Sequence, residues 1–88
     1  MTAFLKCEVS PGMFSHERGV TVATSDGRNI SGFFPVECID EEKQLLKVEI
    51  IEAQFHKYLV RVPGFPADTY GFIGTTSAIW VPKSAIVI

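Results

Sequence analysis

The sequence predicts a single all-β domain, residues 1–88, of five or six short strands, and three observations carry that prediction. Apolar and polar residues alternate over several short stretches, which is the period-two pattern of a half-buried strand. These stretches are rich in β-branched and aromatic residues, which favour strands. Gly, Pro, Asn and Asp gather between them, as they do at turns. The chain is 47% hydrophobic, which is enough material for one core in so small a body.

The first predicted strand covers residues 3–9. Its apolar residues share one parity, and Ser10-Pro11-Gly12 ends the alternation. Residues 13–19 then form a polar and aromatic loop that is longer than a tight hairpin needs. A long loop after the first strand can serve as a binding arm.

A hairpin follows. Residues 20–24 are β-branched almost throughout, Asp26-Gly27 has the positive-φ preference of a hairpin turn, and residues 30–34 form the returning strand. Gly32, inside that strand, indicates a bulge or the close approach of another backbone. Pro35 removes a ladder donor, so we expect the pairing to bend or to reach an edge there.

Residues 45–52 and 57–62 predict two further strands, joined by a turn at residues 54–56. The apolar parity slips at Ile51 and is restored only in the second of these strands. The competing prediction for residues 41–62 is a helix, because Glu, Lys, Gln and Leu are good helix formers. Charged residues would then surround the whole helix and leave no apolar face, so we favour strands. One short helical turn at the connection stays as an alternative.

A long loop between Pro63 and Ser77 follows these strands. Loops of this length are commonly functional or disordered, and the aromatic content of this one favours a function. Two interpretations stay open for its aromatic residues, namely a lid on the core or a contact with a partner. The same holds for the only tryptophan, which either packs in the core or binds a partner. The candidate binding residues are Phe65, Tyr70, Phe72 and Trp80.

The stretch from Trp80 to Ile86 contains an aromatic residue, an aliphatic residue and a proline ahead of a β-branched end. It resembles the end of SH3 domains, and the resemblance implies a small SH3-like barrel in which Pro82 leads through a 3₁₀ turn into a closing strand. In SH3 domains this proline and a tyrosine three residues later line a groove for polyproline ligands. Ala85 stands at the tyrosine position and Ile79 replaces the usual glycine. The resemblance therefore implies the barrel without its peptide groove, as in bacterial small barrels that serve as accessory modules.

No catalytic, metal or cofactor site is predicted. The four residues that could bind zinc lack the Cys-x-x-Cys and His-x₃-His spacings of structural zinc sites. Both cysteines lie in apolar alternating stretches, which predicts reduced, core-packed thiols, with a disulfide as the alternative. The acidic run at residues 40–43 predicts a solvated turn, and no glycine-rich phosphate loop is present. The four residues are Cys7, His16, Cys38 and His56.

Charge and segment patterns restrict the function further. The net charge of −2 comes from interspersed charges and gives no basic face, which argues against nucleic acid as a partner. The sequence has neither the residue order of a signal peptide nor an apolar run of membrane-spanning length, so we expect a cytoplasmic protein that does not enter membranes.

The leading hypothesis is a non-enzymatic protein-interaction or accessory-subunit module, bound to a protein partner or to copies of itself in an oligomer. It is motivated by more apolar material than so small a body can bury. One alternative is a nucleic-acid-binding small barrel with Lys57, Arg61 and Lys83 around its aromatic residues. The other is a small-molecule-binding subunit whose cleft forms only in an oligomer.

Overall fold

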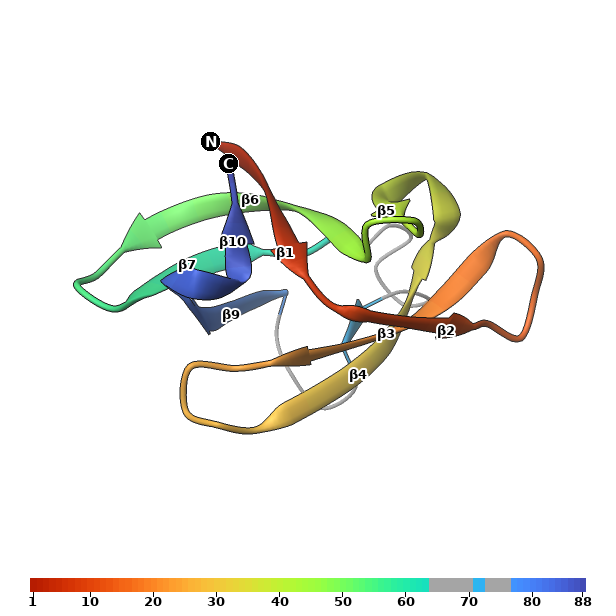
Figure 1. The fold of residues 1–88 in the computed structure, drawn as a ribbon, viewed down its shortest axis with the longest axis horizontal. Coiled ribbons are helices and arrows are strands. Elements are labelled where there is room, and N and C mark those ends of the chain that lie inside the picture. Colours follow the sequence, from red (N-terminus) through yellow and green to blue (C-terminus); the bar gives the residue numbers. More distant parts are fainter. Residues whose placement is uncertain (64–70, 73–76) are drawn as a thin grey trace.

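The computed structural model describes residues 1–63, 71–72 and 77–88 and confirms the all-β prediction (Figure 1). Ten strands and two short 3₁₀ helices occur in these residues. In chain order they are β1 (Thr2–Lys6), β2 (Glu8–Pro11), β3 (Glu17–Ala23), β4 (Asn29–Pro35), η1 (Val36–Cys38), β5 (Ile39–Asp40), β6 (Leu45–Ala53), β7 (Lys57–Arg61), β8 (Gly71–Phe72), β9 (Ala78–Pro82), η2 (Lys83–Ala85) and β10 (Ile86–Val87).

The strand count exceeds the five or six expected from the sequence, for two reasons. The first predicted strand is interrupted at Cys7 and divides into β1 and β2. Three strands, β5, β8 and β10, have only two residues each, which is too short for a period-two pattern to reveal.

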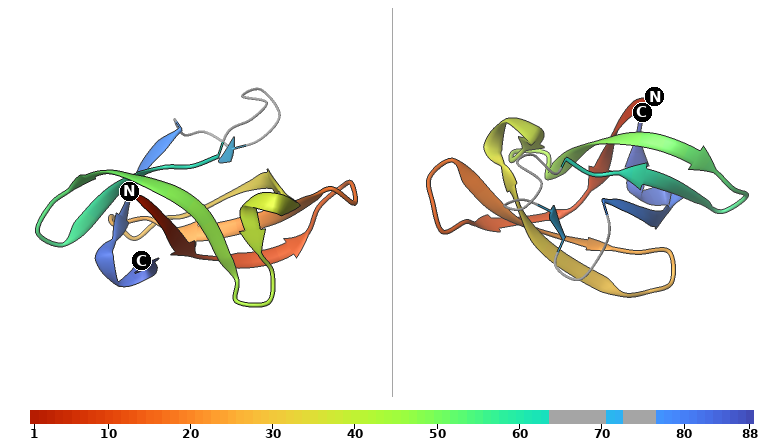
Figure 2. Two further views of the ribbon diagram at one scale, coloured as in Figure 1. Left: turned by 90° about the horizontal axis from the view of Figure 1, so that it is seen from above. Right: turned by 180° about the vertical axis from the view of Figure 1, so that it is seen from behind.

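The strands form two antiparallel sheets. The larger has the order β10-β1-β6-β7-β9, and β5 pairs with the beginning of β6 on the edge that does not face β1. The smaller has the order β2-β3-β4-β8. Because β1 and β2 are nearly continuous, one run of chain supplies a strand to each sheet. Two hairpins, β2–β3 and β6–β7, extend toward opposite ends of the long axis (Figures 1 and 2).

The β3–β4 hairpin forms where the sequence predicts it, and Gly27 in its turn has φ +86°. The Thr24 hydroxyl donates to the Asp26 carboxylate, and the Arg28 N–H donates to the Thr24 hydroxyl over 3.2 Å. Gly32 has the close approach that the sequence indicated, because a Cβ at this position would lie 2.0 Å from the carbonyl oxygen of Gly71 on β8.

The β6–β7 hairpin confirms the strand interpretation of this region over the helical one. Its register shifts between Ile50 and Glu52, so Ile51 forms a bulge. This bulge explains the slip in apolar parity, since an extra residue in one strand reverses the faces of the residues that follow. The turn contains no helical turn, and it is closed by a hydrogen bond of 2.8 Å from the Gln54 N–H to the Lys57 carbonyl.

The carboxyl-terminal stretch follows the predicted local path. After Pro82 the chain makes the single turn η2, and β10 then pairs antiparallel with β1, placing Val87 opposite Phe4. None of the helices in the described part of the chain has the length and apolar character that crossing a bilayer requires.

The core lies between the two sheets, and among the residues that the structure describes Phe34 is the largest fully buried side chain. Cys7 and Cys38 are free thiols that pack against this core. Burial raises the pKa of the Cys7 thiol to about 11. The buried apolar residues are Ala3, Leu5, Val20, Val22, Phe34, Leu46, Val48, Val60, Val62, Phe72, Ile79 and Val81.

Candidate functional site

Trp80 lies on the outer face of the larger sheet. Its neighbours on β9, Ile79 and Val81, are buried, so the alternation of the strand turns Trp80 outward, where it is half-buried. The ammonium group of Lys57 lies over the indole ring, 4.7 Å from its centroid. Lys57 belongs to the adjacent strand β7, two residues before Leu59, which pairs directly with Trp80. The contact therefore depends on the register of two strands that are distant in sequence.

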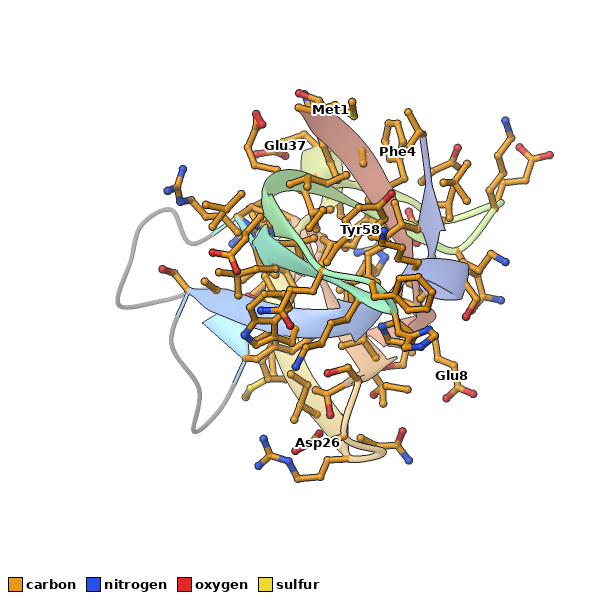
Figure 3. The ribbon with its side chains drawn as sticks, turned by 90° about the vertical axis from the view of Figure 1, so that its left-hand side faces the viewer. Met1, Phe4, Glu8, Asp26, Glu37 and Tyr58 are labelled. Atoms are coloured by element: carbon orange, nitrogen blue, oxygen red, sulfur yellow. The ribbon has the colours of Figure 1, made fainter. Side chains whose placement is uncertain are left out.

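A second lysine–aromatic pair lies at the same end of the sheet. The ammonium group of Lys83, in η2, is 4.9 Å from the centre of the Tyr58 ring. The backbone N–H of Lys83 also donates to the carbonyl of His56 over 3.1 Å, which fixes η2 against the hairpin end. Figure 3 views the molecule from this end, with Tyr58 near the centre.

The tip of the β6–β7 hairpin presents Phe55, which is 85% exposed. Its ring meets the His56 imidazole edge to face, with the centroids 4.3 Å apart. The two lysine–aromatic pairs flank the hairpin on its two faces, because Tyr58 lies opposite the buried Val81 whereas Trp80 faces outward. The tip and these two pairs together form the candidate site, which we call the hairpin surface. It consists of Phe55, Lys57, Tyr58, Trp80 and Lys83.

Of the other three residues singled out from the sequence, Phe72 is described by the structure and does not join this surface. Phe72 is 5% exposed and lies edge to face with Phe34, with the ring centroids 4.9 Å apart. Of the two interpretations left open by the sequence, the structure therefore gives Phe72 the role of a core residue. Phe65 and Tyr70 lie outside the described residues.

Sequence reasoning did not single out Phe55 and Tyr58. The signal available for Phe55 was an aromatic residue in a turn between two strands, where a side chain has little to pack against. For Tyr58 no comparable signal exists, because its contact with Lys83 requires the docking of η2 on the hairpin.

The loop predicted as a binding arm carries a second exposed aromatic pair at the opposite end of the molecule. Phe14 is 60% exposed and stacks on His16, with ring centroids 5.7 Å apart. The base of the loop is fixed by the buried Glu17 carboxylate, which accepts a hydrogen bond of 3.1 Å from the Met13 N–H. Arg18 pairs with Glu41 over 2.7 Å and thereby connects the hairpin to the acidic turn.

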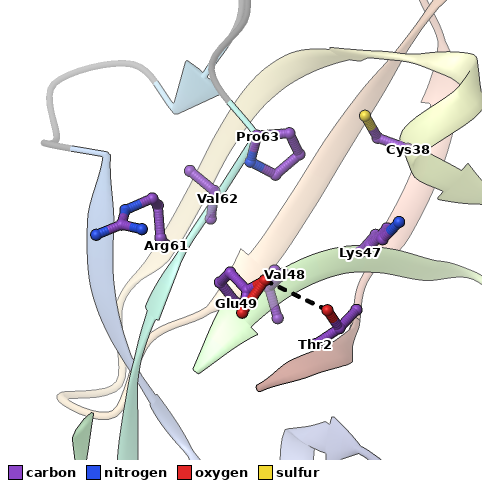
Figure 4. Close-up of a pocket in the computed structure, with 8 residues that line it drawn as sticks. All are labelled: Thr2, Cys38, Lys47, Val48, Glu49, Arg61, Val62 and Pro63. Atoms are coloured by element: carbon purple, nitrogen blue, oxygen red, sulfur yellow. Dashed lines mark hydrogen bonds between the residues drawn. The ribbon is translucent and has the colours of Figure 1, made fainter. Parts of the chain in front are cut away.

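A pocket of about 210 Å³ opens where β6 changes partners (Figure 4). The beginning of β6 pairs with β5 through Leu45 and Leu46, whereas β7 joins only at Glu49. The pocket lies beside Lys47 and Val48, the two residues between these pairings. Its lining residues are Thr2, Cys38, Lys47, Val48, Glu49, Arg61, Val62 and Pro63.

The acidic group of this pocket already has partners. The Glu49 carboxylate lies 3.1 Å from the Met1 amino group and accepts a hydrogen bond of 3.3 Å from the Thr2 hydroxyl. The hydrogen bond from the Met1 amino group lowers the pKa of the Glu49 carboxyl, with further contributions from the charge of that group, Thr2 and Arg61. Burial, together with the charge of Glu37, raises the pKa of the Cys38 thiol. The pocket thus has a neutral thiol and a carboxylate that is already bound.

Among the described residues, neither the hairpin surface nor the pocket has the side chains of a metal centre. Within residues 1–63, 71–72 and 77–88, no cluster of three or more His, Cys, Asp or Glu side chains is placed to hold a metal ion. Comparison of the chain with protein-family models, curated proteins and solved structures gives no match. The geometry of this chain is therefore the guide to its function.

Proposed function

We propose that this chain is a non-enzymatic protein-interaction or accessory-subunit module of the cytoplasm, and that it binds a protein partner through the hairpin surface. The observation that carries the proposal is the 85% exposure of Phe55 on a hairpin whose neighbouring aromatic rings are already held by lysines. Large aromatic side chains dominate the binding energy of many protein interfaces. Because such side chains have only two rotatable bonds, they lose little conformational entropy on binding.

The proposal includes an SH3-like small barrel as the finer class of the fold. Its support is the path from Trp80 through Pro82 and η2 into β10, which has the order of elements at the end of SH3 domains. The two open sheets, linked by the nearly continuous strands β1 and β2, are compatible with a partly open barrel.

A protein partner is favoured over nucleic acid by where the lysines lie. Base stacking requires a free aromatic face, whereas Lys57 covers one face of Trp80 and Lys83 one face of Tyr58. The net charge of −2 also opposes binding to a phosphate backbone. Lysines above aromatic rings suit a protein surface that offers apolar and acidic side chains together.

Site-specific photo-crosslinking in a lysate of the source cells tests this proposal. A benzophenone amino acid at position 55 should give a discrete protein adduct, and Trp80→Ala or Lys57→Glu should reduce its yield at least threefold. Phe14 is the matched control, since it is an exposed phenylalanine in the loop between β2 and β3, and that hairpin lies at the opposite end of the molecule from the β6–β7 hairpin (Figure 1). An adduct of twice the chain mass would identify a second copy as the partner.

Identical adducts from both positions, or none from position 55, would contradict the proposal. A separate titration with single-stranded oligonucleotides at low salt, followed by the fluorescence of Trp80, tests the nucleic-acid alternative. Quenching at micromolar protein would favour that alternative, because a base stacked on the indole ring quenches its fluorescence.

A further inference from the structure

The pocket of Figure 4 is separate from the hairpin surface, since none of its lining residues belongs to that surface. We propose that it binds a small organic monocarboxylate with a compact, branched apolar body. The assignment goes beyond the proposed function and is independent of it. Unlike the cleft expected from the sequence, this pocket is formed within one chain.

The size of the pocket sets the scale of the ligand body that it can accommodate. Its volume of about 210 Å³ corresponds to roughly seven water molecules at about 30 Å³ each. Pockets for drug-sized molecules usually have volumes of about 300–1,000 Å³. A ligand with about seven non-hydrogen atoms therefore fits, and 3-methylbutanoate is a molecule of that size.

The apolar walls of the pocket favour a ligand with an apolar body. Val48 and Val62 are buried core residues that reach the pocket, and Pro63 adds a further apolar wall. Cys38 lies across from Pro63 in Figure 4 and contributes a neutral thiol. A charged or strongly hydrated body would lose its water here without gaining hydrogen bonds, which is unfavourable.

The positively charged side chains at the rim of the pocket favour an anionic ligand. Lys47 is exposed at the edge of the pocket, and among the residues that the structure describes its ammonium group forms no ion pair within 4 Å. The Glu49 carboxylate is occupied by the Met1 amino group and the Thr2 hydroxyl. Arg61 adds a second positive charge, although its side chain extends away from the centre of the pocket in Figure 4. Lys47 is therefore the group expected to meet the ligand carboxylate.

Two-dimensional ¹H–¹⁵N NMR of the intact chain tests this assignment, with 3-methylbutanoate as the probe. Saturable shifts should occur at the amides of Lys47, Val48, Glu49 and Val62. The neutral isostere 3-methylbutanamide and the anion acetate should each bind at least fivefold more weakly. The amide lacks the negative charge, and acetate lacks the branched apolar body. Lys47→Gln should weaken the binding of 3-methylbutanoate by up to about fivefold, the upper end of the range for one solvent-exposed ion pair. Lys43→Gln, at an exposed lysine in the nearby turn, should leave it unchanged.

Three results would overturn the proposal. They are the absence of shifts at these amides up to 50 mM probe, equal binding of the amide and the acid, and equal effects of the two lysine variants. An acetylated Gly-Val dipeptide with a free carboxyl group tests a protein carboxyl terminus as the source of the carboxylate. If it binds tenfold more tightly than 3-methylbutanoate, the assignment to a free small acid is wrong.

Discussion

Substituting Gly32 by alanine should detach β8 from the smaller sheet. The new Cβ would lie 2.0 Å from the Gly71 oxygen and 2.8 Å from the Phe72 Cα, whereas ordinary contacts begin at 3.4 Å. Both obstructing atoms belong to backbone, so no side-chain rotation relieves the clash. The two strands must therefore separate by more than 1 Å, which ends the pairing of Gly32 with Phe72.

The magnitude follows from what Phe72 loses when β8 moves. Burial of its side chain contributes about 1.5–3 kcal/mol, and its edge-to-face contact with Phe34 adds about 0.5–1.5 kcal/mol. Replacing glycine by alanine also restricts the unfolded chain, which offsets about 0.4–1 kcal/mol. The free energy of unfolding should therefore fall by about 1–4 kcal/mol. Equilibrium unfolding in urea, followed by the fluorescence of Trp80, the only tryptophan, measures this change.

Gly19→Ala is the matched control, because Gly19 lies in the adjacent strand β3 of the same sheet. A Cβ there would lie 2.5 Å from the Ser10 hydroxyl oxygen, which is the end of a side chain that can rotate away. This variant should not destabilise the chain, and restriction of the unfolded chain should stabilise it by up to about 0.4–1 kcal/mol. In a Phe72→Ala background the loss caused by Gly32→Ala should shrink, because the packing it disrupts is already gone. Equal losses for the two glycine variants, or additivity in the double variant, would refute the reasoning.

Three further predictions concern the core and the strand edges. Phe34→Ala should lower the free energy of unfolding by about 3–5 kcal/mol, because Phe34 is fully buried. Phe34→Leu should lower it much less in the same urea assay. Equal losses for the two variants would contradict a packing role. Because burial raises the pKa of Cys7 to about 11, its alkylation at pH 8, followed by mass spectrometry, should be about 100-fold slower than in the unfolded chain; a similar rate would contradict that burial. The raised folded-state pKa also means that the thiol contributes stability below pH 9, and this contribution should be lost as the pH rises through 11 and be absent in Cys7→Ala. Gln44→Ala removes the hydrogen bond of 3.1 Å from the Val9 N–H to the Gln44 side chain and should destabilise the chain by about 1 kcal/mol, whereas no change in the urea midpoint would show that water replaces it.

Local patterns predicted the parts of the fold that depend on neighbouring residues. The β3–β4 hairpin, the turn after Pro82 and the close approach at Gly32 each follow from a few adjacent residues and their backbone preferences. The parity slip at Ile51 was also visible, but its interpretation as a bulge needs the partner strand. A pattern along one strand carries no information about which strand lies beside it.

The candidate site was predictable only in part, for the same reason. Trp80 was identified as a binding candidate, but its outward position depends on the parity of β9, and its lysine partner depends on the β7–β9 register. Phe72 looked like a loop residue because β8 has only two residues and is held by pairing with β4. The pocket could not be predicted from the sequence, since it lies where β6 changes from one partner strand to another.

The pairing of the first strand with β6 and β10 sets the order in which the chain can fold. The β3–β4 and β6–β7 hairpins close short loops, whereas β1 must meet residues 45–49 and 86–87. Closing loops of that length costs about 2 kcal/mol more in chain entropy than closing a hairpin, at about 0.6 kcal/mol per doubling of length. We therefore expect the hairpins to form early and the docking of β1 to limit the rate, on the millisecond-to-second scale of nonlocal β topologies. Until β1 docks, the larger sheet lacks the strand that joins β6 to β10, whereas β2, the continuation of the same run of chain, already pairs with β3 in a local hairpin.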